Sequence, residues 1–175
     1  MSELAARLRE TPPKAGRTRV AAIDGRSGSG KSTLAASLAR ELGAPVVSME
    51  DLYGGWDGLE DGVDRLVSDV LVPLSEGRRA FVPRYDWIAG AWGAPVPLDP
   101  PAELVVEGVG AGCARAARYV SLLVWLELPE EIRKHRALER DGDTYDPHWD
   151  RWAAQETAML AREHTPERAD VVMVF

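Results

Sequence analysis

The segment Arg19–Gly43, RVAAIDGRSGSGKSTLAASLARELG, constrains the fold more than any other part of the chain. It begins with a short apolar run of the kind found in buried strands, and a glycine-rich stretch, Gly25–Ser32, follows at once. Leu34, Leu38 and Leu42 then recur at helical spacing. A strand, a tight turn and a helix in this order predict a β–loop–α unit, which needs a sheet with helices packed against it.

The glycine-rich stretch, GRSGSGKS, matches the phosphate-loop pattern G-x-x-x-x-G-K-[ST] and lies between the strand and the helix that the pattern requires. Glycines let the backbone turn its N–H groups toward phosphate oxygens, and the helix start adds the positive end of its dipole. We expect Lys31 to contact the β- and γ-phosphates and the Ser32 hydroxyl to ligate Mg²⁺. The residues predicted to bind the nucleotide are Gly25, Arg26, Ser27, Gly28, Ser29, Gly30, Lys31, Ser32 and Thr33. The predicted cofactors are ATP and Mg²⁺, with GTP left open as the donor.

Strands and helices alternate along the rest of the chain. Apolar runs predict further strands over residues 45–49, 103–108, 119–128 and 169–175. Helices are predicted near residues 4–8, from about 63 with a disturbance at Pro73, from Pro129 and from Asp146. Because the strands are almost continuously apolar, we expect a parallel sheet covered by helices on both faces. The predicted fold class is an α/β, three-layer P-loop NTPase domain with a short lid.

Length and composition limit the other possibilities. With 175 residues the chain suits one domain, 1–175, with 1–17 as an N-terminal extension and about 139–148 as the lid tip. The net charge of −7 argues against a nucleic-acid binder. The single cysteine, Cys113, excludes an intramolecular disulfide and is consistent with a reducing compartment. We find no signal core and no membrane-spanning run, so a cytoplasmic protein is expected, with a homo-oligomer left open. The histidines show no metal-ligand spacing with Cys113, so no structural metal is predicted.

Two adjacent carboxylates, Glu50 and Asp51, end the second predicted strand in SMED. The guanine motif N-K-x-D and the signature L-S-G-G-Q are both missing from the sequence, which favours a small P-loop kinase over a switch GTPase or an ABC ATPase. A kinase must orient an acceptor hydroxyl and accept its proton. Since side chains alternate along a strand, Glu50 and Asp51 would face opposite sides if the strand persists. The residues alone leave open which acid is the base and whether both are merely solvated.

The order of these motifs resembles the uridine/cytidine kinase group of P-loop kinases and, more loosely, their phosphoribulokinase and pantothenate kinase relatives. In that group the second strand runs into an S-x-D-x-F-Y-like segment whose acid is the proposed base. SMEDLY matches it at Ser48 and Tyr53, which implies that the base position falls on Glu50. The resemblance extends from about Val20 to Asp141 and implies transfer of the γ-phosphate of ATP to a hydroxyl of a small molecule, with a nucleoside as the first expectation.

The resemblance also implies an acceptor pocket. VPRYDW, Val82–Trp87, is similar to the P-x-Y-D-[FW] stretch that lines the nucleoside pocket of the family. Tyr85 and Trp87 would stack on a base, Asp86 would take a hydroxyl or amine, and Asp57 would take a sugar hydroxyl. The implied substrate-binding residues are Tyr53, Asp57, Arg84, Tyr85, Asp86 and Trp87. The alternative is a hairpin whose aromatic side chains pack on the core.

LVVEGVGAG, Leu104–Gly112, resembles the Walker-B-like element of the same family. Its acid, Glu107, would approach the Mg²⁺ ion or the acceptor. The implied metal-binding residues are therefore Ser32, Glu50 and Glu107.

Arg133, Arg136 and Arg140 fall on one face of a predicted helix. RALERD is similar to the R-x-x-x-R-D-like end of the family's lid, which implies that Arg136 and Arg140 neutralise charge on the moving phosphoryl group. With the acid at 50 or 51 as the base, the implied catalytic residues are Lys31, Glu50, Asp51, Arg136 and Arg140. The alternative is a solvated helix whose arginines are balanced by its glutamates. Trp149 and Trp152, on the next predicted helix, are expected to pack in the core.

Two other functions stay open. One is a nucleotide-binding regulator or weak ATPase without a small-molecule acceptor, which we expect to lack a cavity beside the phosphate loop. The other is a P-loop kinase for a different acceptor: a sugar acid, a vitamin precursor or an antibiotic. Acceptor choice depends on a few pocket contacts, and sequence does not decide it.

Overall fold

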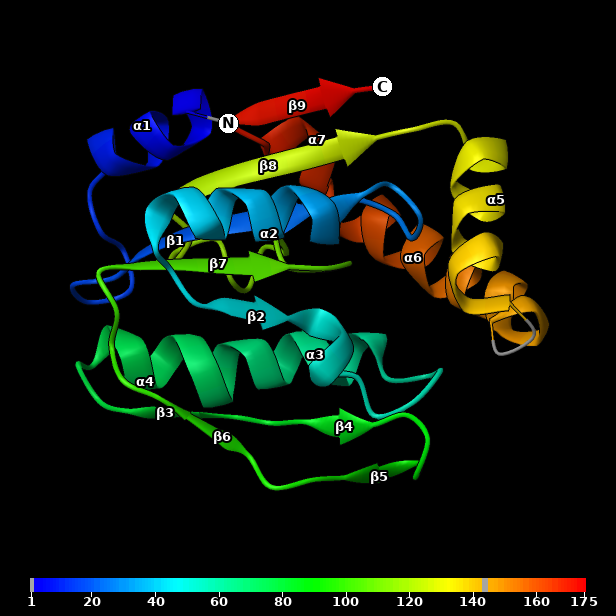
Figure 1. Ribbon diagram of the computed structural model, residues 1–175, viewed down its shortest axis with the longest axis horizontal. Helices are drawn as coiled ribbons and strands as arrows, with labels where there is room; N and C mark the ends of the chain where they lie inside the picture. The colour runs from blue at the N-terminus through cyan, green and yellow to red at the C-terminus, as the bar shows by residue number, and fades with distance from the viewer. Residues whose placement is uncertain (1, 143–144) are drawn as a thin grey trace.

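The computed structural model describes residues 2–142 and 145–175. In this part of the chain the centre is a five-stranded sheet of order β2-β7-β1-β8-β9 in which all the pairings are parallel (Figure 1). The strands are β1 (Arg19–Asp24), β2 (Val46–Ser48), β7 (Glu103–Glu107), β8 (Leu122–Glu127) and β9 (Val171–Val174). The predicted parallel α/β sheet is confirmed.

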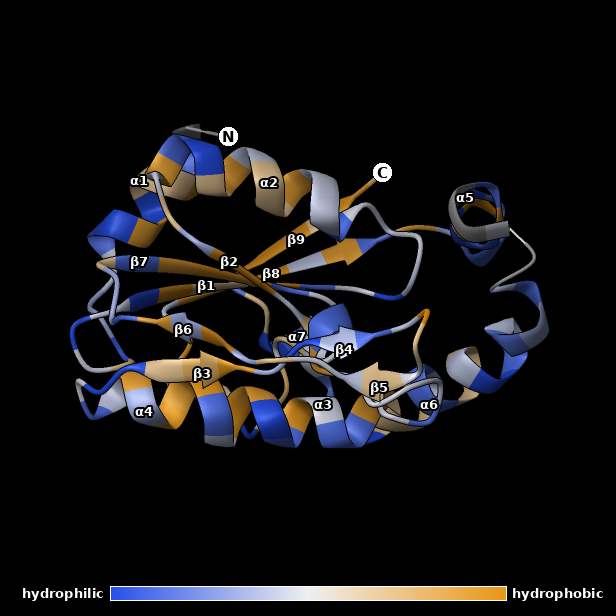
Figure 2. Ribbon diagram, turned by 60° about the horizontal axis from the view of Figure 1, so that its bottom comes forward, coloured by the Kyte–Doolittle hydropathy of each residue, from blue (hydrophilic) through white to orange (hydrophobic). Residues whose placement is uncertain are grey.

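Helices cover both faces of this sheet, which gives three layers (Figure 2). On one face lie α1 (Ser2–Glu10) and α2 (Lys31–Leu42), packed on Ala21 and Ile23 of β1. Val20 and Ala22 point into the other core, beneath α3 (Leu59–Arg65) and α4 (Val72–Ser75). Adjacent residues of β1 therefore serve opposite cores, as the alternation of side chains along a strand requires. This double burial explains why the strands are apolar throughout.

The helical segment after the second strand begins earlier than expected, at Leu59 rather than about Val63. Between α3 and α4 it widens into a π-helical stretch, Leu66–Leu71, where the N–H of Val72 bonds to the carbonyl of Val67. Pro73 follows, and it has no N–H to donate to the preceding turn. The predicted disturbance near Pro73 is confirmed and takes this form.

Two small antiparallel ribbons, which were not predicted as strands, lie beyond α3 and α4 (Figure 1). One pairs β3 (Ala80–Val82) with β6 (Val96–Leu98), and the other pairs β4 (Tyr85–Asp86) with β5 (Ala91–Trp92). The strands are two or three residues long, too short for a periodic pattern to reveal them.

After β8 the chain forms α5 (Glu130–Asp141), a 3₁₀ turn (Asp146–His148), α6 (Trp149–Glu163) and α7 (Thr165–Arg168). Of these, α5 and α6 lie at the carboxyl edge of the sheet, and α7 lies against β8 (Figure 1). Pro129 is the N-cap of α5 rather than its first residue. Within the predicted lid tip, residues 143–144 lie outside the described part.

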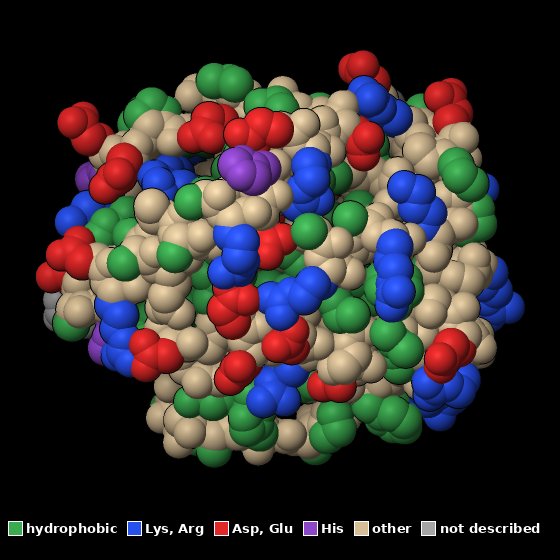
Figure 3. All heavy atoms as spheres, turned by 180° about the vertical axis from the view of Figure 1, so that it is seen from behind, with side chains coloured by type: hydrophobic (Ala, Val, Ile, Leu, Met, Phe, Trp, Pro, Cys, Tyr) green, Lys and Arg blue, Asp and Glu red, His purple; other side chains and the backbone are tan. Residues whose placement is uncertain are grey.

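Acidic and basic side chains are interspersed on the face of the molecule in Figure 3, with no continuous basic stripe among the residues described there. None of the helices in residues 2–142 and 145–175 combines the length and apolarity needed to cross a bilayer.

Candidate active site

The phosphate loop joins the end of β1 to the start of α2 and has a backbone that only glycine accepts readily. Gly28 and Gly30 have φ of 79° and 94°. Gly28 also lies directly beneath the start of α5, because a Cβ built on it would come within 2.1 Å of the Arg133 carbonyl oxygen. The glycines therefore permit both the turn and the close approach of α5.

A cavity of about 630 Å³ opens beside the loop. Its lining residues are Ser27, Gly28, Gly30, Lys31, Ser32 and Thr33 of the loop and α2; Glu50, Glu107, Gly108 and Val109; the aromatic residues Tyr53, Trp56, Trp87, Tyr145 and Trp152; and Arg136 and Ala137 of α5. We call the five aromatic residues the aromatic wall. The phosphate loop and the acids follow the ends of strands, and the aromatic wall comes from the segments and helices around the carboxyl edge of the sheet. A ligand site of a parallel sheet is expected at this edge.

Lys31 is the buried cation of the cavity, with 8% of its surface exposed. Its Nζ donates to the Arg26 carbonyl oxygen at 3.0 Å, inside the loop. Burial lowers the pKa of Lys31 below its usual value, while Glu156, ahead of three other carboxylates, opposes that shift. An ammonium group so placed is suited to pair with a phosphate anion.

Ser32 and Glu107 form the oxygen-rich corner that a magnesium ion would need. The Ser32 hydroxyl donates to Oε2 of Glu107 at 3.1 Å, and the Ser48 hydroxyl donates to Oε1 at 2.7 Å. Across the β2–β7 pair, Ser48 is the register partner of Glu107. No cluster of three or more His, Cys, Asp or Glu side chains suited to a metal occurs in the described part of the chain. A hydroxyl and a carboxylate nevertheless fit Mg²⁺, which takes few protein ligands and keeps waters and phosphate oxygens.

The second strand does not persist to Glu50 and Asp51, so the alternation expected for a continuing strand does not apply to them. The strand ends at Ser48, whose hydroxyl accepts the N–H of Glu50 at 3.3 Å, and Met49–Asp51 form a 3₁₀ turn. Glu50 lines the cavity, whereas Asp51 pairs with Arg84 at 2.9 Å outside the lining. Partial burial raises the pKa of Asp51, and the charge of Arg84 opposes the rise.

The aromatic wall is centred on Trp56. Its ring lies 4.9 Å from that of Trp87 in an edge contact and 5.2 Å from that of Tyr145 in a stacked one. Tyr53 donates its hydroxyl to the Val109 carbonyl at 2.7 Å, and burial raises the pKa of this phenol well above its usual value. Tyr53 therefore presents a ring to the cavity, and its hydroxyl is already bonded.

The other residues implied for the acceptor lie outside the cavity lining. Asp57 pairs with Arg151, and Arg84 pairs with Asp51. The Asp86 carboxylate accepts the N–H groups of Ile88 and Ala89 in the hairpin, both at 2.9 Å. Tyr85 packs edge-on against Trp87, with ring centres 5.4 Å apart. Of the residues predicted to bind the acceptor, the structure brings Tyr53 and Trp87 to the cavity.

Two arginines of α5, Arg136 and Arg133, contact the site from different sides. Arg136 lines the cavity from the helix. Arg133 is 3% exposed and donates to the carbonyl oxygens of Leu128 at 3.0 Å and Ser27 at 3.2 Å, so it holds the loop from behind. The side chain of Arg140, predicted to act beside Arg136, lies outside the described residues.

Comparison with known proteins gives a fold and no closer relationship. No family model matches the chain, and no curated protein does. Among solved structures, a possible uridine kinase from Bacillus stearothermophilus is similar at a TM-score of 0.69 and 23% identity, over 98% of this chain and 96% of that one. A candidate fructose transport system kinase from Silicibacter sp. TM1040 is similar at a TM-score of 0.65 and 20% identity, over 98% of both chains. The chain shares the fold of these two structures, an α/β fold of the P-loop NTPase type.

Sequence analysis missed several residues that shape this P-loop site. Trp56 and Tyr145 were not named as site residues, although the segment that begins at Trp56 was expected at the acceptor pocket, and Trp152 was assigned to the core. Two carboxylates, Asp24 and Glu156, were also missed. Both are buried, with 1% of each residue's surface exposed. An acid as the last residue of β1 was a usable signal for Asp24. For Glu156 the signal was an acid four residues after Trp152, on the face of α6 predicted to be buried.

Proposed function

We propose that this protein is an ATP-dependent P-loop kinase that phosphorylates a hydroxyl of a small, nucleoside-like molecule. The observation that carries the proposal is the shared cavity, which has the phosphate loop on one side and Glu50 and the aromatic wall on the other. Donor phosphates and an acceptor hydroxyl would meet in this one space, as in-line phosphoryl transfer requires.

In the proposed mechanism the loop N–H groups and Lys31 bind the phosphates of ATP. Ser32 and Glu107 would hold Mg²⁺, which would supply positive charge toward the phosphate oxygens. Glu50 orients the acceptor hydroxyl and accepts its proton as the oxygen bonds to the γ-phosphorus and the bond to ADP breaks. Arg136 lies where it would offset negative charge on the moving phosphoryl group.

The aromatic wall supports an acceptor with a flat ring. Stacking on indole or phenol rings favours a base over a fully hydroxylated sugar acid. The names of the two similar structures point to a nucleoside and to a sugar, and these acceptors belong to those proteins. A regulator without an acceptor was expected to lack a cavity beside the loop, so the cavity argues against that alternative.

The test is an ADP-release screen with nucleosides, sugars, sugar acids and antibiotics that carry hydroxyl groups. We expect acceptor-dependent turnover with a nucleoside or a close analogue, and none with Lys31→Ala. Acceptor-independent hydrolysis of ATP with every compound would refute the kinase proposal in favour of an ATPase. A cytoplasmic location stays a prediction, and fractionation of the source cells would test it.

A further inference from the structure

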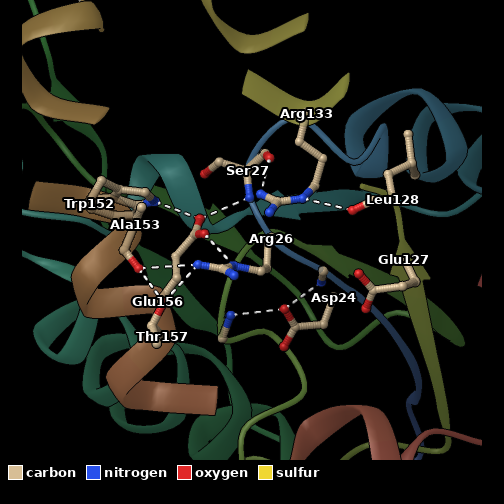
Figure 4. Close-up of polar contacts among 12 residues, drawn as sticks. Asp24, Arg26, Ser27, Glu127, Leu128, Arg133, Trp152, Ala153, Glu156 and Thr157 are labelled. Carbon is tan, nitrogen blue, oxygen red and sulfur yellow. Dashed lines mark hydrogen bonds and ion pairs between the residues drawn. The ribbon is translucent and has the colours of Figure 1, made fainter. Parts of the chain in front are cut away.

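The carboxylate of Glu156, on α6, contacts the phosphate loop (Figure 4), and Glu156 is not among the residues that line the cavity. Its Oε1 accepts the Ser27 N–H at 2.8 Å, and its Oε2 lies 3.2 Å from Nε of Arg26. The residue is 1% exposed. A buried carboxylate is destabilising unless it is paired and hydrogen-bonded, and here both oxygens are engaged.

Arg26 lies along α6 and does not line the cavity. One of its terminal nitrogens donates to the Thr157 hydroxyl at 2.8 Å and to the Ala153 carbonyl at 3.3 Å (Figure 4). Two successive loop residues, Arg26 and Ser27, are thus attached to one turn of helix. This attachment orients the Ser27 N–H toward α6.

Oε1 of Glu156, which accepts the Ser27 N–H, also contacts the aromatic wall. Oε1 accepts the indole N–H of Trp152 at 3.0 Å, one helical turn earlier (Figure 4). Trp152 lines the cavity and meets the Tyr53 ring edge-on at 4.9 Å. Gln155 adds a bond from its side-chain amide to the Trp56 carbonyl at 2.7 Å. One turn of α6 therefore contacts both sides of the cavity.

We propose that Glu156 is a positioning residue that couples nucleotide binding at the phosphate loop to the aromatic wall through Trp152. The inference rests on the proposed function, because it requires a nucleotide on the loop. Since a single oxygen accepts both N–H groups, a shift of the loop on binding phosphate alters the bond to the indole, and a shift of the indole alters the bond to the loop. Such coupling is reciprocal, so whatever fixes Trp152 also changes nucleotide affinity.

The experiment is a double-mutant cycle on ADP affinity, measured by calorimetry on the full chain without any acceptor. Trp152→Phe keeps a ring in the wall and removes the N–H donor, and Glu156→Gln removes the charge with little change of shape. We expect Trp152→Phe alone to weaken ADP binding about fivefold and to change it less than twofold in the Glu156→Gln background. Equal effects in both backgrounds, or no effect in either, would overturn the proposal.

Glu163→Gln is the matched control. Glu163 lies on the same helix and accepts the Ala114 N–H at 2.7 Å, away from the loop, so its replacement should leave ADP affinity unchanged. If Glu156→Gln does not fold, Glu156→Asp takes its place in the cycle, because the shorter carboxylate cannot reach both N–H groups. Failure of the wild-type protein to bind ADP would refute the proposed function and this inference together. ADP binding with additive effects would refute this inference alone.

Discussion

Asp24, the last residue of β1, bonds to the phosphate loop and to the turn after β7. Its titration should dominate the pH dependence of the free energy of unfolding between about pH 4 and 6. The side chain is 1% exposed. Its oxygens accept the N–H groups of Gly25 at 2.7 Å, Gly112 at 2.8 Å and Gly110 at 3.1 Å. Burial raises the pKa of Asp24 from 3.8 to about 6, although these bonds and the charge of Lys31 oppose the rise.

The sign follows from which state holds the proton more tightly. The folded state binds it with a pKa of about 6 and the unfolded state with a pKa near 3.8. The contribution of Asp24 to stability is therefore complete below about pH 4 and is lost as pH rises through about 6. A shift of about two units corresponds to roughly 3 kcal/mol in the free energy of unfolding.

The assay is urea unfolding of the wild type and Asp24→Asn at a series of pH values from 4 to 7.5. Asparagine does not titrate, so the wild type should lose about 3 kcal/mol more than the variant across this range. The amide places a donor opposite one backbone N–H, which shifts the variant's stability by a constant and leaves its pH dependence unaffected. A stability difference that stays flat with pH, or grows in the other direction, would refute the reasoning.

The remaining predictions concern the loop and the base. Lys31→Ala should weaken ADP binding at least tenfold in calorimetry, and unchanged affinity would contradict the phosphate-loop assignment. Glu50→Gln should lower kcat in the ADP-release assay by roughly 10²–10⁴, against less than about tenfold for Asp51→Asn; equal small losses would mean that neither is the base. Gly28→Ala should destabilise by about 2 kcal/mol more than Gly30→Ala in urea unfolding, because a Cβ at Gly28 meets a backbone carbonyl oxygen at 2.1 Å whereas one at Gly30 meets nothing within 4 Å. Both glycines have positive φ, so equal destabilisation would show that strain alone decides.

The sheet and the phosphate loop could be predicted because their signals are local. Strands such as β8, buried on both faces apart from its last residue, need an unbroken apolar run. The glycines, Lys31 and Ser32 follow β1 directly, so pattern and context lie in one stretch of chain.

The acids after β2 show where local patterns mislead. Alternation of Glu50 and Asp51 was expected only if the second strand persists through them. The Ser48 hydroxyl instead accepts the Glu50 N–H, and the chain turns. Side chains of serine compete with strand pairing in this way, and the hydrophobic pattern does not register it.

The aromatic wall was missed for a different reason. Its members come from separate parts of the chain: Trp56 lies in the loop before α3, Tyr145 follows α5, and Trp152 lies on α6. They meet only in the folded chain. Trp152 was correctly expected to be buried, at 4% exposed, but burial does not distinguish a core residue from one that lines a cavity. Only the position of the cavity separates the two.

The two buried carboxylates, Asp24 and Glu156, show why the phosphate-loop pattern predicts phosphate binding but not the conformation of the loop. Asp24 bonds to the loop at Gly25 and to the turn after β7, and Glu156 bonds to Ser27 from α6. The pKa of about 6 for Asp24 means that its hydrogen bonds do not offset the cost of burying the charge. A group whose contribution to stability is lost at neutral pH, yet which bonds to the loop at its first glycine, is better explained by positioning than by stability. The loop is thus held through Asp24 to the turn after β7 and through Glu156 to α6, and both segments lie far along the chain from the eight-residue pattern.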